Sequence, residues 1–147
     1  MLGLLLLTGG RMFDFVESIE VGTAGERSLV VTQEHTAARW GSGLLQVFST
    51  PHMVALMEGA AVDAVDPQLP EGYQTVGTHL HIDHLAATPI GQKVTARARL
   101  LAIDGRRLTF RVEAFDDAGL IGEGEHQRFI VDVARFMTKA AARSTSR

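Results

Sequence analysis

Three polar side chains near the middle of the chain could carry acid–base or nucleophilic chemistry. The first is Glu58, which lies two turns into the almost wholly apolar stretch MVALMEGAAVDAV. An unpaired carboxylate is costly to bury, so Glu58 must find a partner, reach water or stay protonated. An ordinary exposed glutamate that points outward through a gap in the fold would give the same pattern, and both explanations stay open.

The other two candidates are His84 and Thr50. Strand alternation places His84 on the face that carries Leu80 and Ile82, which should lie toward the helix. A core or edge histidine without a catalytic role is the competing explanation. Thr50 comes just before Pro51, so its hydroxyl should cap the helix N-terminus, where it is also well placed to act on a bound acyl group.

The spacing of Thr50 and Glu58 limits how they could cooperate. About eight helical residues separate them, which corresponds to a rise of about 12 Å. Side chains this far apart on one regular helix cannot both touch one small group of atoms. Two copies of the helix that lie antiparallel across a dimer interface would solve this problem, with each site drawing residues from both chains.

A metal site is the less favoured reading of a further polar cluster. His79, His81 and Asp83 alternate along one strand, on the face opposite to His84. Such ligands would need a third protein ligand elsewhere, so we expect an exposed polar sheet face instead. The chain has no cysteine, which excludes disulfides, thiolate zinc sites and thiol nucleophiles. We expect no metal and no other cofactor.

A buried helix should position Thr50 and Glu58. The segment STP at residues 49–51 is typical of a helix start, and the prolines at 67 and 70 should end the helix near Val65. Its apolar residues fall on most sides of the helical wheel, so the helix should be buried over much of its circumference. Glycine and several alanines make it slim enough for another backbone to approach closely.

Strands should surround this helix. A turn at residues 22–25 precedes a first strand at 29–32, which a loop or broken helix connects to the central helix. After Tyr73 an antiparallel meander is expected, with strands at residues 75–84, 94–103, 108–115 and 120–131 and turns at 104–105 and 116–119.

A slim apolar helix needs a curved sheet, because its several apolar sides cannot all face one flat layer. We therefore predict an α+β hotdog fold, in which a curved antiparallel five-stranded sheet wraps around a central helix. Such a sheet covers the helix on one side only. Edge-to-edge pairing of two sheets in a homodimer should bury the remainder, and further assembly beyond the dimer stays open.

Composition limits the class of partner. The chain has 147 residues, a net charge of −3 and a pI of about 6.0, so nothing in its electrostatics suggests nucleic-acid binding. The apolar run at residues 4–7 is far shorter than the roughly 18 residues of a membrane span and lacks the features of a signal peptide. We expect a cytoplasmic protein with a non-native or disordered leader at 1–11, one domain at 12–136 and a basic tail at 137–147.

Three segments resemble the motifs of the fluoroacetyl-CoA thioesterase-like branch of the hotdog thioesterases: STPHMVALMEGAA, VGTHLHIDHLAATPIGQKV and GEGEHQRFIVD. The similarity runs from about Phe13 to Phe136. The resemblance implies that Thr50, Glu58 and His84 form the catalytic set. It also implies that Gly77 offers its backbone N–H to the acyl group and that Arg128 contacts the substrate. The fluoroacetate specialist of this family has a lid built with phenylalanine, and the segment HTAARWGSGLLQVF does not match it residue by residue.

The resemblance implies an acyl-CoA thioesterase that acts on an ordinary short or medium acyl-CoA. Glu58 would attack the thioester or activate water, while His84 supplies a proton to the thiolate and Thr50 holds the carboxylate and water in position. Two alternatives remain from other classes. One is an enoyl-CoA hydratase or dehydratase on the same fold, and the other is a non-catalytic module that binds acyl-CoA or another small ligand.

Overall fold

The computed structural model describes residues 18–145, so the expected leader at 1–11 lies outside the described residues. The strands are β1 (Ala24–Val30), β2 (Tyr73–His84), β3 (Lys93–Asp104), β4 (Arg107–Asp116) and β5 (Gly119–Asp132). The helical segments are η1 (Gln33–His35), α3 (Ala37–Trp40), α4 (Thr50–Val65), η2 (Asp66–Gln68) and α5 (Val133–Thr145). The predicted central helix and hairpin strands are therefore present, with bounds close to those expected.

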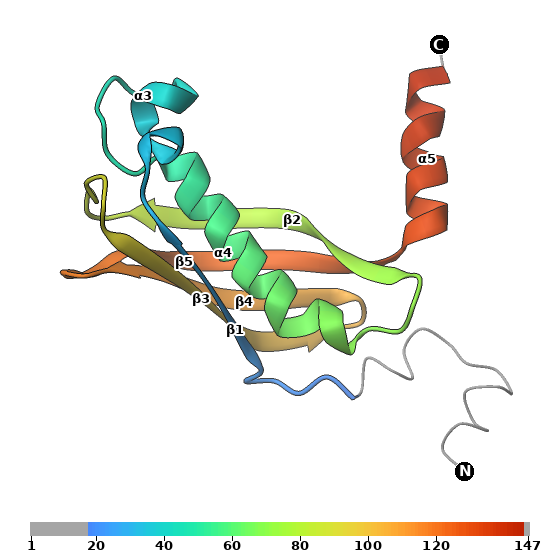
Figure 1. Cartoon of the computed structure of the whole chain (residues 1–147). Coiled ribbons are helices and arrows are strands. Elements are labelled where there is room, and N and C mark those ends of the chain that lie inside the picture. Colours follow the sequence, from blue (N-terminus) through green and yellow to red (C-terminus); the bar gives the residue numbers. More distant parts are fainter. Residues whose placement is uncertain (1–17, 146–147) are drawn as a thin grey trace, which may run out of the picture.

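The five strands form one antiparallel sheet that curves around α4, which confirms the predicted α+β architecture (Figure 1). The strand order is β1-β3-β4-β5-β2. The expected meander was wrong in one respect, because only β3, β4 and β5 follow one another, whereas β2 crosses to the far edge and pairs with β5. Alternation along a strand identifies the strand but does not identify its neighbour.

The core lies between the concave face of the sheet and α4. Eight residues of this helix are buried: Met53, Leu56, Met57, Gly59, Ala60, Ala61, Ala64 and Val65. They pack against the inward faces of the sheet, including the fully buried Leu100 and Phe110. Burial over most of the circumference, which the apolar pattern predicted, holds the helix in a fixed position relative to the sheet.

Strand β1 begins at Ala24, earlier than the predicted Leu29, because Gly25 is a strand residue and not part of the turn. A Cβ atom at Gly25 would lie 2.6 Å from the backbone nitrogen of Ala64 on α4. Glycine is therefore required there by the close approach of the helix. The turn itself is made by Gly22, whose φ of +100° suits a residue without a side chain.

The N-terminus of α4 differs from the prediction in the role of Thr50. Ser49 is the N-cap, and its hydroxyl accepts a hydrogen bond from the backbone N–H of His52. Thr50 is instead the first helical residue. The expected capping role of Thr50 was wrong, and its hydroxyl is consequently available for a contact outside the helix.

A bulge in β2 changes which side chains face the helix. Gly77 pairs with Arg128 and His79 pairs with Gln127, so Thr78 is an extra residue between two paired positions. Regular alternation would place Gly77 and His84 on opposite faces of the strand. The extra residue reverses the alternation, so both of them face α4. The predicted faces were correct from Leu80 onward and wrong before the bulge, where Thr75 and Gly77 point inward.

Helix α5 follows β5 and extends away from the sheet (Figure 1). It contains Lys139 and Arg143 of the expected basic tail, and Arg135 and Lys139 on it are exposed. Arg147 lies outside the described residues. It begins at Val133, within the segment 12–136 expected as the domain. None of the helices in residues 18–145 combines the length and apolar character required to cross a membrane.

Candidate active site

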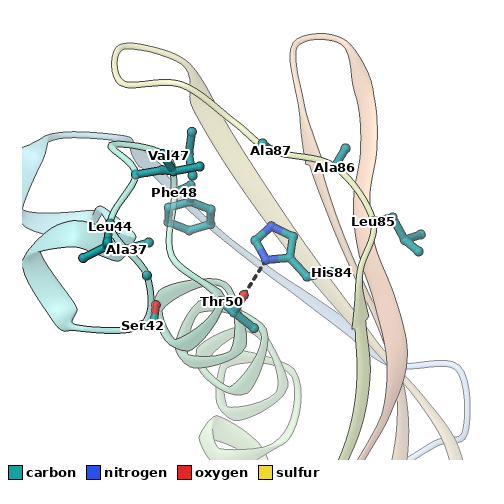
Figure 2. Close-up of a pocket in the computed structure, with 12 residues that line it drawn as sticks. Ala37, Ser42, Leu44, Val47, Phe48, Thr50, His84, Leu85, Ala86 and Ala87 are labelled. Atoms are coloured by element: carbon teal, nitrogen blue, oxygen red, sulfur yellow. Dashed lines mark hydrogen bonds between the residues drawn. The ribbon is translucent and has the colours of Figure 1, made fainter.

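A pocket of about 450 Å³ lies between the N-terminus of α4, the end of β2 and the loop that follows α3 (Figure 2). Its lining is mainly small and apolar: Ala37, Ser42, Gly43, Leu44, Leu45, Val47, Phe48, Thr50, His84, Leu85, Ala86 and Ala87. Thr50 and His84 point toward each other within it. An apolar pocket with a few polar groups is the usual form of a small-molecule site.

Thr50 and His84 form a hydrogen bond of 2.7 Å between Oγ1 and Nδ1. Burial lowers the pKa of His84 below its ordinary value, while the backbone carbonyl of Ala86 acts in the opposite direction. The second ring nitrogen, Nε2, is buried and has no hydrogen-bond partner within the described part of the chain. A neutral imidazole in this position can accept the proton of the Thr50 hydroxyl.

Glu58 lies two turns further along α4 and both reaches water and has a partner. Its side chain is 37% exposed, and Oε2 lies 3.6 Å from Nη1 of Arg128. The carboxylate therefore avoids the cost of isolated burial in the way the sequence required. A half-exposed carboxylate beside a fixed cation can serve as a nucleophile or a general base.

Arg128 belongs to β5 and is nearly buried, with 8% of its side chain exposed. Its Nε donates to the hydroxyl of Thr75 at 2.8 Å, and Nη2 donates to the carbonyl of Thr75 at 3.0 Å. Burial lowers the pKa of Arg128, and the carboxylates of Asp66 and Glu58 oppose this effect. An arginine nevertheless stays charged in proteins, so this part of the site holds a fixed positive charge.

Gly77 completes the surroundings of Glu58. A Cβ atom at this position would lie 2.8 Å from Oε2 of Glu58, 3.3 Å from Cε1 of His126 and 3.4 Å from Nη1 of Arg128. A side chain at residue 77 would therefore displace the Glu58 carboxylate and crowd the His126 ring, while it would meet Arg128 at an ordinary contact distance. The absence of one leaves space beside the carboxylate in which a small group could lie.

The five residues singled out by the sequence thus form two groups on one chain. The first group is the Thr50–His84 pair at the N-terminus of α4. The second, which we call the Glu58 cluster, consists of Glu58, Gly77 and Arg128. The two groups are about 12 Å apart along the helix axis, and one chain does not bring them together.

The residues His79, His81 and Asp83 are exposed on the outer face of β2. Across residues 18–145, no group of three or more histidine, cysteine or acidic side chains is arranged to hold a metal ion. Sequence reasoning missed the buried polar residues Thr75 and His126. Their signal was weak, because the bulge that turns Thr75 inward and the strand pairing that buries His126 are not visible along one strand.

Comparison with known proteins connects this geometry to a family. The family FlK, fluoroacetyl-CoA-specific thioesterase, matches residues 31–134. A curated fluoroacetyl-CoA thioesterase of Streptantibioticus cattleyicolor is 44% identical over 94 residues, which cover 64% of this chain and 68% of that protein.

Solved structures agree with the match. The structure of the fluoroacetyl-CoA thioesterase FlK is similar with a TM-score of 0.79 and 36% identity, over 84% of this chain and 96% of that one. A variant of FlK in complex with acetyl-CoA has a TM-score of 0.80 at 35% identity, over 84% of this chain and 98% of that one.

A thioesterase superfamily member of Thermus thermophilus is 30% identical, with a TM-score of 0.79 over 88% of this chain and 98% of that one. A hot-dog-like protein of Thermanaerovibrio acidaminovorans is 27% identical, with a TM-score of 0.80 over 88% of this chain and 96% of that one. These likenesses agree with the hotdog arrangement of sheet and helix, and the family match confirms the resemblance that the three segments carry. The chain belongs to the FlK family of fluoroacetyl-CoA-specific thioesterases.

Proposed function

We propose that this protein hydrolyses the thioester bond of a short or medium acyl-CoA and releases the free acid and CoA. The observation that carries the proposal is the 2.7 Å hydrogen bond between Thr50 and His84 in the lining of a mainly apolar pocket. Thioesters join a small apolar acyl group to a polar leaving group. A pocket with apolar walls and a paired hydroxyl and imidazole at one end suits that chemistry.

Glu58 is the proposed nucleophile or general base. If Glu58 attacks the carbonyl carbon, the C–S bond breaks, an acyl anhydride forms and water then releases the acid; if it acts as a base, it takes a proton from the attacking water. His84 supplies the proton to the departing thiolate. Thr50 positions the carboxylate and water, since a hydroxyl both donates and accepts hydrogen bonds.

Two groups are proposed to bind the substrate. The backbone N–H of Gly77 would stabilise the negative charge that develops on the carbonyl oxygen, which is often the largest single contribution to acyl transfer. Arg128 would contact the substrate through the part of its guanidinium that faces Glu58. Both groups lie in the Glu58 cluster, where Gly77 leaves room for a small group.

A homodimer is part of this proposal, because the Thr50–His84 pair and the Glu58 cluster are separated on one chain. Strand β2 is at the edge of the sheet and pairs only with β5 among the described strands. Leu80, which lies on the helix-facing side of β2, is 44% exposed. Pairing of two β2 edges would cover such residues and place the Thr50 of one chain near the Glu58 of its partner.

The short or medium length of the acyl group and a cytoplasmic location are expectations from the sequence and belong to the same proposal. The acetyl-CoA complex of the FlK variant supports a small acyl group. One substrate panel contains fluoroacetyl-CoA, acetyl-CoA, butyryl-CoA and octanoyl-CoA. Comparison of their kcat/KM values shows which acyl length the protein prefers and whether it prefers a fluorinated acyl group.

The test is release of free thiol across this panel, for the unaltered protein and for the variants Glu58→Gln and His84→Ala. We expect each variant to lower kcat by about two to four orders of magnitude, as lost acid–base groups do. The matched control is His81→Ala, since His81 is an exposed histidine of the same strand on the other face. Near-normal turnover by Glu58→Gln would refute its role.

Two outcomes would favour the alternative functions. Hydration of crotonyl-CoA without thiol release would indicate a hydratase. Binding of acyl-CoA without thiol release or hydration, unchanged by Glu58→Gln, would indicate a non-catalytic binding module.

A further inference from the structure

A chain of largely buried polar groups lies beneath Glu58, and the mechanism above uses only one member of it, Arg128. His126 is fully buried in β5, two residues before Arg128, so both side chains face α4. Its ring lies nearly parallel to that of Phe110, with centroids 6.3 Å apart and an interplanar angle of 29°. A polar ring enclosed in this way is stable only when its nitrogens have partners.

The partners of His126 determine its protonation. Nδ1 lies 2.8 Å from the backbone carbonyl oxygen of His79, and a carbonyl only accepts, so Nδ1 carries a hydrogen. Nε2 lies 3.0 Å from Nη1 of Arg128, and a guanidinium only donates, so Nε2 carries none. His126 is therefore a neutral imidazole with both nitrogens engaged.

The electrostatics agree with the neutral form. Burial lowers the pKa of His126, an effect that the hydrogen bond to the His79 carbonyl opposes and the charge of Arg128 reinforces. A protonated His126 would also place a second cation within hydrogen-bond distance of the guanidinium. The ring is consequently held in one tautomer, with its single acceptor aimed at Arg128.

Thr75 and Asp66 hold the other side of the guanidinium. Thr75 donates its hydroxyl hydrogen to Oδ1 of Asp66 at 2.5 Å, and its backbone N–H donates to Oδ2 at 3.0 Å. The hydroxyl oxygen of Thr75 then accepts from Nε of Arg128, and the carbonyl of Thr75 accepts from Nη2. Nη1 is left between His126 and Oε2 of Glu58.

We propose that His126 is a positioning residue of the thioesterase site, which holds the Arg128 guanidinium so that Nη1 faces the Glu58 carboxylate beside Gly77. This inference rests on the proposed role of Glu58. Thr75 fixes one side of the planar guanidinium and His126 fixes the other, so removal of the His126 acceptor allows Nη1 to move away from Glu58. A fixed distance between the guanidinium and the carboxylate matters, because a displacement of about 1 Å can cost about a hundredfold in rate.

Two substitutions separate this role from simple packing. His126→Gln can place a carbonyl oxygen near the position of Nε2, so it retains an acceptor for Arg128. His126→Asn is shorter and reaches only the position of Nδ1, so it retains a partner for the His79 carbonyl and loses the acceptor for Arg128. We expect the asparagine variant to lower kcat about ten- to hundredfold and the glutamine variant to stay within about threefold of the unaltered protein.

A double variant shows whether His126 acts through Arg128. In the Arg128→Met background, His126→Asn should cause no further loss of kcat, because the group that it positions is already gone. A purely structural role predicts a different result, in which both His126 variants lower the unfolding temperature and reduce kcat equally in either background. That result would overturn the proposal.

A measurement without substrate distinguishes failure of this inference from failure of the proposed function. Nitrogen-15 NMR of the Arg128 guanidinium should show separate Nη1 and Nη2 signals in the unaltered protein, since hydrogen bonds on both sides restrict rotation. Exchange between the two signals should be faster in His126→Asn, where Nη1 has lost its acceptor while Nε and Nη2 keep Thr75, and unchanged in His126→Gln. Merged signals in the unaltered protein, or exchange in His126→Asn as slow as in the unaltered protein, would overturn the proposal even if no acyl-CoA were hydrolysed.

Discussion

Substitution of Gly77 by alanine should impair catalysis while it leaves the fold intact. The new Cβ would lie 2.8 Å from Oε2 of Glu58, whereas ordinary contacts begin at 3.4 Å, so the carboxylate must retreat by at least about 0.6 Å. If 1 Å of misplacement costs about a hundredfold, this shift corresponds to a loss of about tenfold or more in kcat. The backbone N–H of residue 77 remains, so the loss would report on the carboxylate.

The effect of Gly77→Ala on the free energy of unfolding should be small. The atom that must move is the far end of a flexible side chain, and alanine is favoured over glycine within a strand by about 0.5–1 kcal/mol. We therefore expect the free energy of unfolding to change by less than about 1 kcal/mol. Gly77→Ala is neither strained by a left-handed backbone nor opposed by backbone atoms at the nearest contact.

The assay is thiol release from acetyl-CoA, with kcat and KM determined for Gly77→Ala and for the same change in a Glu58→Gln background, and with urea unfolding of each protein. The single variant should lose about tenfold, and the change should have little effect once Glu58 is glutamine. A Gly77→Ala protein with normal kcat and normal stability would refute the reasoning. Equal losses in both backgrounds would also refute it, since the effect would not then pass through Glu58.

Three further predictions concern the hydroxyl, the histidines and the helix contact. Thr50→Val should lower kcat at least tenfold in the thiol-release assay, whereas Thr50→Ser keeps the hydroxyl that bonds His84 and should retain most activity. Because burial lowers the pKa values of His52, His84 and His126 in the folded protein, the unfolded chain binds more protons, so urea unfolding should show full stability above about pH 6.5 and falling stability below it. Gly25→Ala should cost about 3 kcal/mol in urea unfolding or prevent folding, because its Cβ would meet the backbone of α4.

The pH prediction fails if stability is constant or rises between pH 6.5 and 5. The Thr50 prediction fails if valine and serine variants have equal kcat. A Gly25→Ala protein as stable as the unaltered one would show that the helix and β1 are less closely packed than the structure indicates.

Local sequence signals were sufficient for the elements that position Thr50 and Glu58. A hydroxyl residue followed by proline, then an apolar stretch ended by further prolines, predicted the central helix, and α4 has those bounds. Strand alternation and hairpin turns predicted β3, β4 and β5 in the same way. Such signals act within a few residues, which is why they can be read from one chain.

Features that depend on contacts between distant segments could not be predicted. The bulge at Thr78 exists only relative to the register of β5, and it decides that Gly77 and His84 share the helix-facing side. Gly25 was taken for a turn residue because its real constraint, the backbone of α4, is about 39 positions away in the sequence. The same limit hid His126, whose partners come from β2 and from its own strand.

The most direct test of a site shared between two chains is complementation in a mixed dimer. A Thr50→Val chain and a Glu58→Gln chain, each expected to have at most about a tenth of the normal kcat alone, would be co-expressed with different affinity tags and purified as the mixed species. If each site takes Thr50 from one chain and Glu58 from its partner, one of the two sites is intact, and thiol release should recover to about half of the unaltered dimer. A monomeric protein, or a mixed dimer as inactive as its two parents, would contradict the shared site.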